Sequence, residues 1–428
     1  MHVSTPQLRV LTGCTRGCSP WIMALGVLSM LILTFGPEPA GAQDPVAVPP
    51  GFDDAWAEVA DFFHQTAQAR GVVGGALWFV RDGQVLAREL HGDANRETGT
   101  PVTDETIFHW ASNTKTLTGI AILQLRDRGT LSLDDPAVRW LPELRKIHTP
   151  FGPVEEVTIR RLLSHTAGFR ASTWPWGGGE PWHPFEPTRW EELAAMMPWT
   201  ELLFEPGTRF GYSNPGIVFL ARIVEEASGE PWEAYVEKRI FRPLDMHRSY
   251  VRHTPPHLQR HRSNAYRLEE GEPIARGPDF DPGVTVSNSG LNAPVPDLIR
   301  YLAWLSGALD APVLDRASLQ EMWDPVVEVG GGAAWGEAHE EMGLTFFLTP
   351  YPEGRLVGHA GRQWSHLSFF YVDPETGAGA IGVVNTDGVP EPDRILDART
   401  FMNEIRTRLV HAVFPRFHGT VPEPGAGR

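Results

Sequence analysis

The chain has 428 residues, of which 42% are hydrophobic and 21% charged, and its formal net charge is −16. This acidic excess disfavours nucleic acids and anionic membrane surfaces as partners, so a small-molecule, peptide or cell-wall-derived substrate is easier to accommodate. Only three of the 37 basic residues are lysines: Lys115, Lys146 and Lys238. Because lysine, unlike arginine, can lose its proton in a suitable environment, each of the three is a candidate base.

The first 42 residues have the parts of a secretory signal peptide. Arg9 and Arg16 precede an apolar run over 21–35, and small residues at 40–42 form a cleavage site. We therefore expect export to the periplasm or the medium, and a single domain over 43–428. The apolar run, at about 15 residues, is shorter than the roughly 20 that a membrane-spanning helix needs, and no later segment is long enough, so no stable membrane span is expected.

Both cysteines, Cys14 and Cys18, lie before the predicted cleavage site. The mature chain is therefore predicted to contain no thiol and no disulfide, and its stability must come from its core. An alternative interpretation makes 11–14 a lipid-attachment box, but such a box follows the apolar run, whereas this one precedes it.

The secondary structure begins with a helix predicted over 53–69. Strands at 76–81 and 84–90 flank Asp82-Gly83, the sequence typical of a two-residue hairpin turn. Dense apolar residues between Ser112 and Arg128, with a glycine just beyond, predict a largely buried helix. Further helices are expected at 157–164, 190–197, 214–228, 231–240, 296–306, 316–323 and 392–412, and strands at 355–360, 365–372 and 379–385, with a turn at 373–377.

Strands near both ends of the chain, with helices between them, predict one antiparallel sheet built from distant segments. We expect an α+β fold in which terminal helices flank this central sheet and a mostly helical lobe is inserted. The cleft between the two lobes is the natural substrate site. Segment 172–190, with four tryptophans among glycines and prolines, is predicted to be an exposed insertion that either packs on its own aromatic rings or borders the cleft.

Ser112 and Lys115 stand three residues apart at a predicted helix start, so their side chains share one face, about one turn apart. A serine hydroxyl needs a base to become a good nucleophile, and a neutral lysine can be that base. The positive end of the helix should favour the neutral amine and stabilise a developing oxyanion. The same spacing also fits a helix cap followed by a solvated lysine, so other motifs must decide between the two.

Two later segments complete a pattern. Tyr212 stands just before a predicted helix and Asn214 at its start, and His359 and Gly361 lie on a predicted strand. In chain order, Ser112/Lys115, Tyr212-Ser213-Asn214 and His359-Ala360-Gly361 resemble the S-x-x-K, Y-x-N and [K/H/W]-x-G motifs of the β-lactamase-related serine hydrolases, which include class C β-lactamases, DD-peptidases and esterases. Segments 108–118, 129–136, 159–168 and 240–246 also resemble that family, and the resemblance covers about 52–411.

The resemblance implies the β-lactamase/transpeptidase-like fold and a role for each matching residue. It implies that Ser112 forms an acyl-enzyme, that Lys115 and Tyr212 transfer protons, that Asn214, His359 and Gly361 bind substrate, and that the backbone N–H groups of Ser112 and Arg362 form the oxyanion hole. A tyrosine titrates near pH 10, so we expect the charge of Lys115 to make the Tyr212 proton accessible. A side chain at position 361 would block close approach of the substrate backbone.

His359 stands where a typical β-lactamase has lysine. Histidine at that position is familiar in D-amino-acid peptidases, some carboxypeptidases and esterases of the family. It can donate a hydrogen bond, but it is largely neutral near pH 7 and binds a carboxylate less strongly than lysine does. The expected substrates are therefore an ester, a D-amino-acid amide or peptide, or a β-lactam, in that order. The alternative is a penicillin-binding sensor or receptor with little turnover.

No metal or cofactor is expected. His253, His257 and His261 recur every four residues, but Pro255 and Pro256 interrupt any helix that would align them. They are predicted to form a surface stretch. The sequence carries no signal for an oligomeric state.

Overall fold

The computed structural model describes residues 47–176, 183–184, 186–330, 340–388 and 398–419. Residues 46–428 form one compact unit. The predicted signal peptide lies outside the described residues and stays a prediction. Within the described ranges, no helix is long and apolar enough to cross a membrane.

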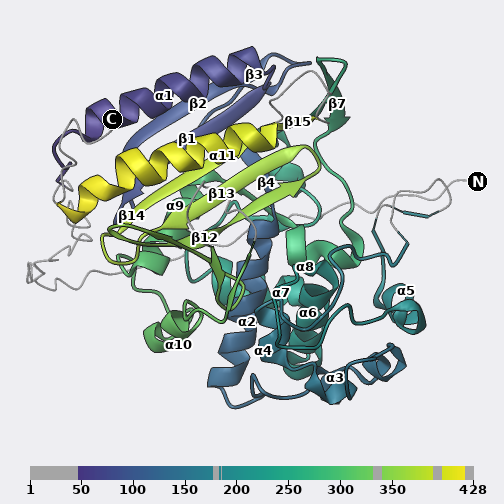
Figure 1. Ribbon diagram of the computed structural model, residues 1–428. Helices are drawn as coiled ribbons and strands as arrows, with labels where there is room; N and C mark the ends of the chain where they lie inside the picture. The colour runs from purple at the N-terminus through teal and green to yellow at the C-terminus, as the bar shows by residue number, and fades with distance from the viewer. Residues whose placement is uncertain (1–46, 177–182, 185, 331–339, 389–397, 420–428) are drawn as a thin grey trace, which may run out of the picture. The chain divides into compact units, whose positions relative to one another are not determined.

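A nine-stranded antiparallel sheet is the centre of this unit, in the order β3-β2-β1-β14-β13-β12-β11-β10-β9 (Figure 1). Its strands are β1 Gly74–Arg81, β2 Gln84–Asn95, β3 Thr100–Pro101, β9 Val327–Glu328, β10 Glu341–Met342, β11 Phe347–Tyr351, β12 Gly354–Gln363, β13 His366–Val372 and β14 Ala378–Val384. β1 pairs with β14 from Gly75 opposite Val384 to Arg81 opposite Ala378. The prediction of one sheet built from distant parts of the chain is thus confirmed.

The predicted hairpin joins β1 and β2. Asp82 and Gly83 both have positive φ, 51° and 76°, as a turn that matches the twist of two antiparallel strands requires. Glycine adopts this conformation without strain, whereas aspartate adopts it at a modest cost.

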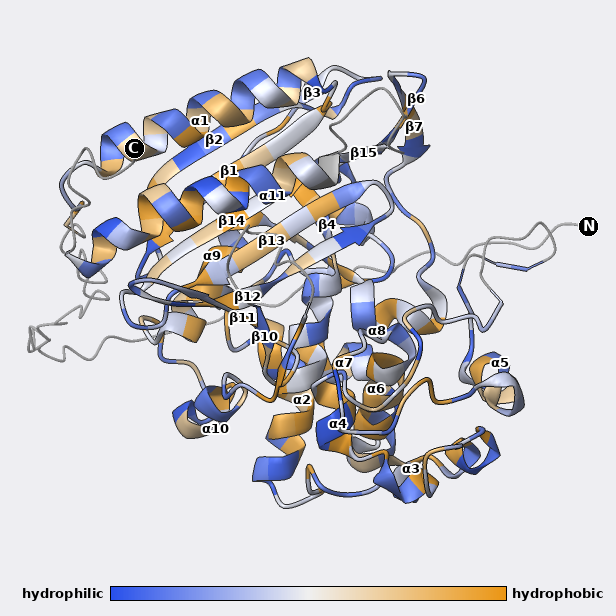
Figure 2. Cartoon of the chain, in the orientation of Figure 1, coloured by the Kyte–Doolittle hydropathy of each residue, from blue (hydrophilic) through white to orange (hydrophobic). Residues whose placement is uncertain are grey.

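Helices α1 (Phe52–Ala69) and α11 (Ala398–Arg408) lie side by side over one face of the sheet (Figure 1). Both alternate hydrophilic and hydrophobic residues, as helices with one buried face do (Figure 2). Phe63 of α1 stacks on Phe401 of α11, with ring centroids 5.9 Å apart. Of the helix predicted over 392–412, residues 392–397 lie outside the described part of the chain.

The helical lobe and α9 (Val295–Ser306) belong to a second core on the other face of the sheet. The remaining helices are α2 Lys115–Asp127, α3 Ala137–Trp140, α4 Ile159–Leu163, α5 Trp190–Ala195, α6 Asn214–Ser228, α7 Trp232–Val236, α8 Val286–Ser289 and α10 Arg316–Glu321. α6 has the predicted bounds because Ser213 caps it: its Oγ accepts a hydrogen bond from the Gly216 N–H at 3.1 Å. The predicted helix over 231–240 instead divides into α7 and a π-helical turn, Glu237–Phe241.

Two small sheets were not predicted from the sequence. One contains β4 Ile107–Ala111, β5 Tyr250–Val251 and β8 Leu291–Pro294, and the other β6 Ala265–Glu269, β7 Glu272–Gly277 and β15 Thr386–Gly388. Most of these strands are too short to show an alternating hydrophobic pattern. β4 matters most for function, because Ser112 follows it directly.

Candidate active site

Ser112 lies at the point where β4 turns into a short 3-10 helix (Ser112–Thr114) that continues directly into α2. The turn is made at Ala111, whose φ of 48° and ψ of −129° are unusual for a residue with a side chain. Such a conformation costs on the order of 1–3 kcal/mol and persists only when its surroundings enforce it. Here the Thr114 Oγ donates to the Ala111 carbonyl at 2.6 Å and accepts from the Leu291 N–H at 2.9 Å.

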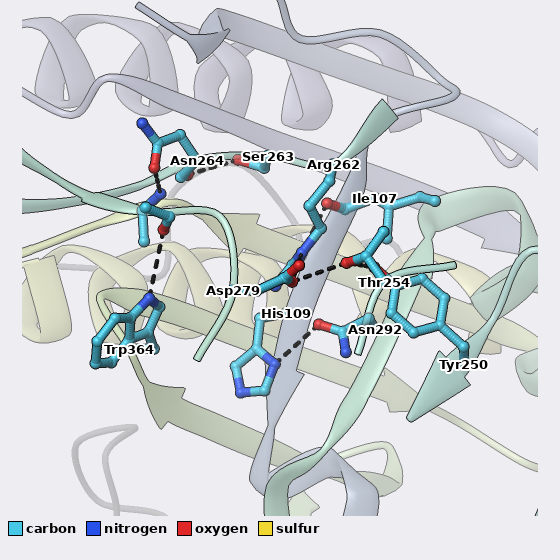
Figure 3. A network of polar contacts seen from close by, with 12 residues as sticks. Ile107, His109, Tyr250, Thr254, Arg262, Ser263, Asn264, Asp279, Asn292 and Trp364 are labelled. Carbon is cyan, nitrogen blue, oxygen red and sulfur yellow. Dashed lines mark hydrogen bonds and ion pairs between the residues drawn. The ribbon is translucent and has the colours of Figure 1, made fainter. Parts of the chain in front are cut away.

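A buried polar network fixes β4 before it reaches the cavity (Figure 3). The His109 Nδ1 donates to the Asn292 Oδ1 at 3.0 Å, which ties β4 to β8. Arg262 donates to the Ile107 carbonyl at 3.1 Å and to the Asp279 carboxylate at 3.2 Å. Burial lowers the pKa of His109 to about 4, so this histidine is a neutral structural group.

Lys115 and Tyr212 both meet Ser112. The Lys115 Nζ is 3.0 Å from the Ser112 Oγ and 3.0 Å from the Asn288 carbonyl oxygen. It lies 4.9 Å from the centre of the Tyr212 ring, and the Tyr212 side chain is hydrogen-bonded to that of Ser112. The alcohol, the amine and the phenol are therefore brought together from positions a hundred residues apart.

The amine of Lys115 is poised to be neutral. The residue is fully buried, with 0% of its surface exposed. Burial lowers the pKa of Lys115 well below its ordinary value, and the Glu186 carboxylate opposes that shift. Desolvation is thus the main effect that favours the neutral amine, where the sequence had suggested the helix N-terminus.

The expectation for the Tyr212 proton was wrong. Burial raises the pKa of the phenol above its ordinary value, and the hydrogen bond with Ser112 offsets this only in part. The physical reason is that desolvation penalises the charged phenolate more than the neutral phenol. In the resting site Tyr212 is therefore a protonated phenol, able to donate.

A cavity of about 400 Å³ opens at Ser112. Its lining includes Ser112, Tyr212, Asn214, His359, Gly361 and Arg362, while Lys115 is buried beside Ser112. The Arg362 guanidinium is held by Asp387 at 2.8 Å. The structure thus gathers every site residue that the sequence singled out.

His359 differs from its expected role. Its Nδ1 lies 2.7 Å from the Ala360 carbonyl oxygen, and because a carbonyl only accepts, Nδ1 must carry the hydrogen. Burial lowers the pKa of His359 to about 3, so the ring is neutral and its Nε2 is an acceptor. That Nε2 is buried and has no hydrogen-bond partner among the described residues. The predicted donor to a substrate carboxylate is therefore an acceptor.

Gly361 is required by the protein's own backbone. A Cβ at this position would lie 2.4 Å from the Trp110 carbonyl oxygen and 2.9 Å from the Ser368 Oγ. β12 can therefore pack against the end of β4 only through a glycine. This contact sets the cavity wall beside Ser112, whether or not a substrate approaches the same strand.

Two residues at the site carry no motif and were missed: Asn288, whose carbonyl contacts Lys115, and Glu186. Glu186 belongs to the tryptophan-rich segment. There Trp174 is only 8% exposed and stacks on His183, with ring centroids 4.7 Å apart. The segment thus packs partly on its own aromatic rings and also brings a carboxylate toward Lys115. Residues 177–182 and 185 lie outside the described part.

The three regularly spaced histidines are dispersed. Only His257 and His261 belong to the 3-10 helix Pro256–His261, and His261 lies 3.3 Å from the Glu105 carboxylate. In the ranges that the structure describes, no group of three or more His, Cys, Asp or Glu side chains is arranged to hold a metal ion.

The antiparallel sheet, its terminal helices and the helical lobe above a Ser-Lys-Tyr cluster define the β-lactamase and penicillin-binding-protein class. The family model described as Beta-lactamase matches residues 59–401. The chain therefore belongs to the β-lactamase family, as its motifs indicated, and the predicted β-lactamase/transpeptidase-like fold is confirmed.

Among curated proteins, Esterase EstB of Burkholderia gladioli is 33% identical over 214 residues, which is 48% of this chain and 54% of the esterase. The match thus spans about half of that relative. An octameric penicillin-binding protein homologue from Pyrococcus abyssi superposes with a TM-score of 0.68 and 28% identity, covering 78% of this chain and 74% of that one. A D-amino acid amidase from Ochrobactrum anthropi SV3 gives a TM-score of 0.67 with 23% identity, over 84% and 98% of the two chains.

Proposed function

We propose that this protein is a serine hydrolase that forms an acyl-enzyme on Ser112. One observation carries the proposal: a fully buried lysine amine lies 3.0 Å from a serine hydroxyl at the wall of a cavity. A buried amine that is free of its proton can accept one from a serine at that distance. A solvated lysine beside a helix cap would remain charged and could not.

The acyl transfer follows from the resting protonation states. Lys115 accepts the Ser112 proton while the Ser112 Oγ bonds to the substrate carbonyl carbon, and the backbone N–H groups of Ser112 and Arg362 stabilise the oxyanion. The leaving alcohol or amine departs with a proton supplied through Tyr212 and Lys115. Water then attacks the ester on Ser112, passes its proton back through the same groups, and releases the acid and the free serine.

The order of substrates rests on the hydrogen-bonding state of His359. His359 is neutral and presents an acceptor, so it offers no hydrogen-bond donor to a substrate carboxylate. Esters and D-amino-acid amides, which need not carry a carboxylate, are therefore favoured over β-lactams, which usually do. The similarity to an esterase and to a D-amino acid amidase supports the same order.

Turnover and labelling test the proposal. Purified protein is incubated with a chromogenic short-chain ester, a D-alanyl amide and a cephalosporin, and separately with a fluorophosphonate. We expect hydrolysis of at least one substrate and labelling at Ser112, both lost in Ser112→Ala, with a rate loss of about 10⁴-fold or more. Labelling of the alanine variant would exclude Ser112 as the nucleophile. Stable acylation by penicillins with no turnover of the three substrates would instead identify a sensor or receptor.

We also propose that the protein is exported after cleavage behind residue 42. The support is the basic start, apolar run and small-residue site of the first 42 residues. Expression of the full chain in a bacterium, followed by fractionation and N-terminal analysis, should recover an extracytoplasmic protein that begins at Gln43. An uncleaved cytoplasmic product would contradict this.

A further inference from the structure

The strand that leads to Ser112 and the strand that carries Arg362 belong to different sheets. β4 pairs with β8 in a three-stranded sheet, whereas β12 pairs with β11 and β13 in the nine-stranded sheet. Among the residues that the structure describes, no shared ladder of backbone hydrogen bonds therefore sets the distance between β4 and β12. That distance matters, because the two N–H groups of the proposed oxyanion hole must both lie about 2.7–3.1 Å from one oxygen.

One buried histidine spans the gap between these strands. His109 of β4 is only 2% exposed, and Figure 3 shows it beside Asn292 of β8. Its Nδ1 lies 3.0 Å from the Asn292 Oδ1, and its Nε2 lies 3.2 Å from the Gln363 Oε1 at the end of β12. His109 stands three residues before Ser112. Gln363 comes directly after Arg362, so the bridge connects the strands beside both N–H groups.

The direction of the two hydrogen bonds follows from the protonation of His109. Burial lowers the pKa of His109 to about 4, so the ring is neutral and carries a single N–H. The Asn292 Nδ2 donates to the Gly290 carbonyl at 3.0 Å, which leaves its Oδ1 to accept from the His109 Nδ1. The His109 Nε2 is therefore an acceptor. The Gln363 amide must meet it with its NH2 group, with the positions of its oxygen and nitrogen exchanged.

Tight packing already limits how closely the two strands can approach. A Cβ at Gly361 would lie 2.4 Å from the Trp110 carbonyl oxygen, so the backbones of β12 and β4 are in contact. The Ser368 Oγ of β13 donates to the same carbonyl at 3.1 Å. Packing thus opposes a shorter spacing, and the hydrogen bonds of Ser368 and His109 oppose a longer one. Of these two residues, only His109 bonds to β12 itself.

We propose that His109 and Gln363 are positioning residues that hold the two halves of the oxyanion hole at a fixed spacing. Neither is among the residues that line the Ser112 cavity, so they act through the N–H groups of Ser112 and Arg362. The inference rests on the proposed function, which assigns the oxyanion to these two groups. Because the oxyanion develops only in the transition state, loss of the bridge should lower kcat and leave KM nearly unchanged.

Two variants and their combination test the bridge with a chromogenic short-chain ester. Gln363→Leu removes the amide. His109→Asn keeps an amide near the position of Nδ1, beside Asn292, and leaves no group at the position of Nε2. We expect each variant to lower kcat about tenfold or more, per active site counted by fluorophosphonate labelling, as a misplaced oxyanion donor does. Because both changes remove the same bond, the double variant should lose about as much as one single variant.

A thionoester separates the oxyanion hole from the base. Its sulfur is larger than oxygen and accepts N–H hydrogen bonds more weakly, so a well-formed oxyanion hole favours the oxygen ester. Gln363→Leu should therefore slow the oxygen ester more than the thionoester, whereas damage to the base would slow both. Gln124→Leu is the matched control. It removes a buried amide near the other end of α2, where the Gln124 Nε2 donates to the Val313 carbonyl at 2.6 Å, and it should change neither kcat nor the ratio of the two substrates.

Wild-type kcat in Gln363→Leu, or equal losses with the ester and the thionoester, would overturn the positioning role and leave the serine chemistry standing. Additive losses in the double variant would show that the two residues act separately and would also contradict the bridge. If His109→Asn fails to fold, Gln363→Leu decides alone, since the Gln363 side chain is only half-buried. No turnover by the wild type and no labelling of Ser112 would count against the nucleophile and the bridge together.

Discussion

Two regions beside Lys115 are built differently: the floor, residues 110–116, and the flank, residues 171–173, 186–187 and 284–288. Polar side chains tie down the floor: the Asn113 Nδ2 donates to the Trp110 carbonyl and to the Ser368 Oγ, both at 2.8 Å, and the Thr116 Oγ donates to the Asn113 carbonyl at 2.9 Å. Among the described residues, the floor leaves the Asn113 Oδ1 buried without a hydrogen-bond partner, whereas the flank leaves several such atoms, including the Glu186 Oε2 and the Asn288 Nδ2.

The two regions therefore differ in what their polar groups can do. The groups proposed to break bonds must be held in place before substrate arrives, and the hydrogen bonds of the Asn113 and Thr116 side chains do that for the floor. The buried polar atoms of the flank that have no partner in the described chain cost free energy instead, so they call for a ligand or a function.

Replacing Lys115, the proposed catalytic base, should have the largest effect on the rate. Lys115→Arg keeps a positive charge but cannot accept the serine proton, so we expect a loss in kcat of about 10³-fold, nearly as large as in Lys115→Ala. Lys238→Arg is the matched control, because Lys238 is exposed and pairs with Glu230. Steady-state rates with the best substrate measure this. Near-wild-type rates in Lys115→Arg would reduce Lys115 to an electrostatic partner.

A side chain at position 361, where β12 packs against the end of β4, should have the next largest effect. Gly361→Ala places a Cβ 2.4 Å from the Trp110 carbonyl oxygen, so β12 and β4 must move apart. We expect the free energy of unfolding to fall by about 1–3 kcal/mol, as overpacking does. Urea denaturation with an unchanged m-value would measure it. An unchanged urea midpoint would show that β12 and β4 move apart without a loss of stability.

The smallest expected effect is the contribution of Glu186 to the free energy of unfolding. Because folding raises the pKa of Glu186 from 4.5 to about 7, the folded state binds its proton more tightly than the unfolded state does. Its destabilising contribution is absent below about pH 4.5, grows as the pH rises, and is complete above about pH 7. Glu186→Gln should therefore raise the free energy of unfolding by about 1 kcal/mol at pH 8 and leave it nearly unchanged near pH 4. Equal effects at both values would refute the burial of an ionisable group.

Local sequence predicted the elements that carry strong local signals. The bounds of α6 follow from the Ser213 cap, from Pro215 in the first turn and from Gly229 at the end, where φ is 71°. The hairpin at Asp82-Gly83 is equally local. β4 was missed because its five residues are all buried and do not alternate, so they look the same in a strand as in a buried helix.

The sequence by itself determined the family and singled out Ser112, Lys115 and Tyr212, because those depend on residue types at short spacings. Only the tertiary structure decided that Tyr212 keeps its proton, that His359 accepts rather than donates, and that a carboxylate from a segment without a motif reaches Lys115. The physical reason is that protonation and hydrogen-bond direction depend on burial and on partners from distant parts of the chain.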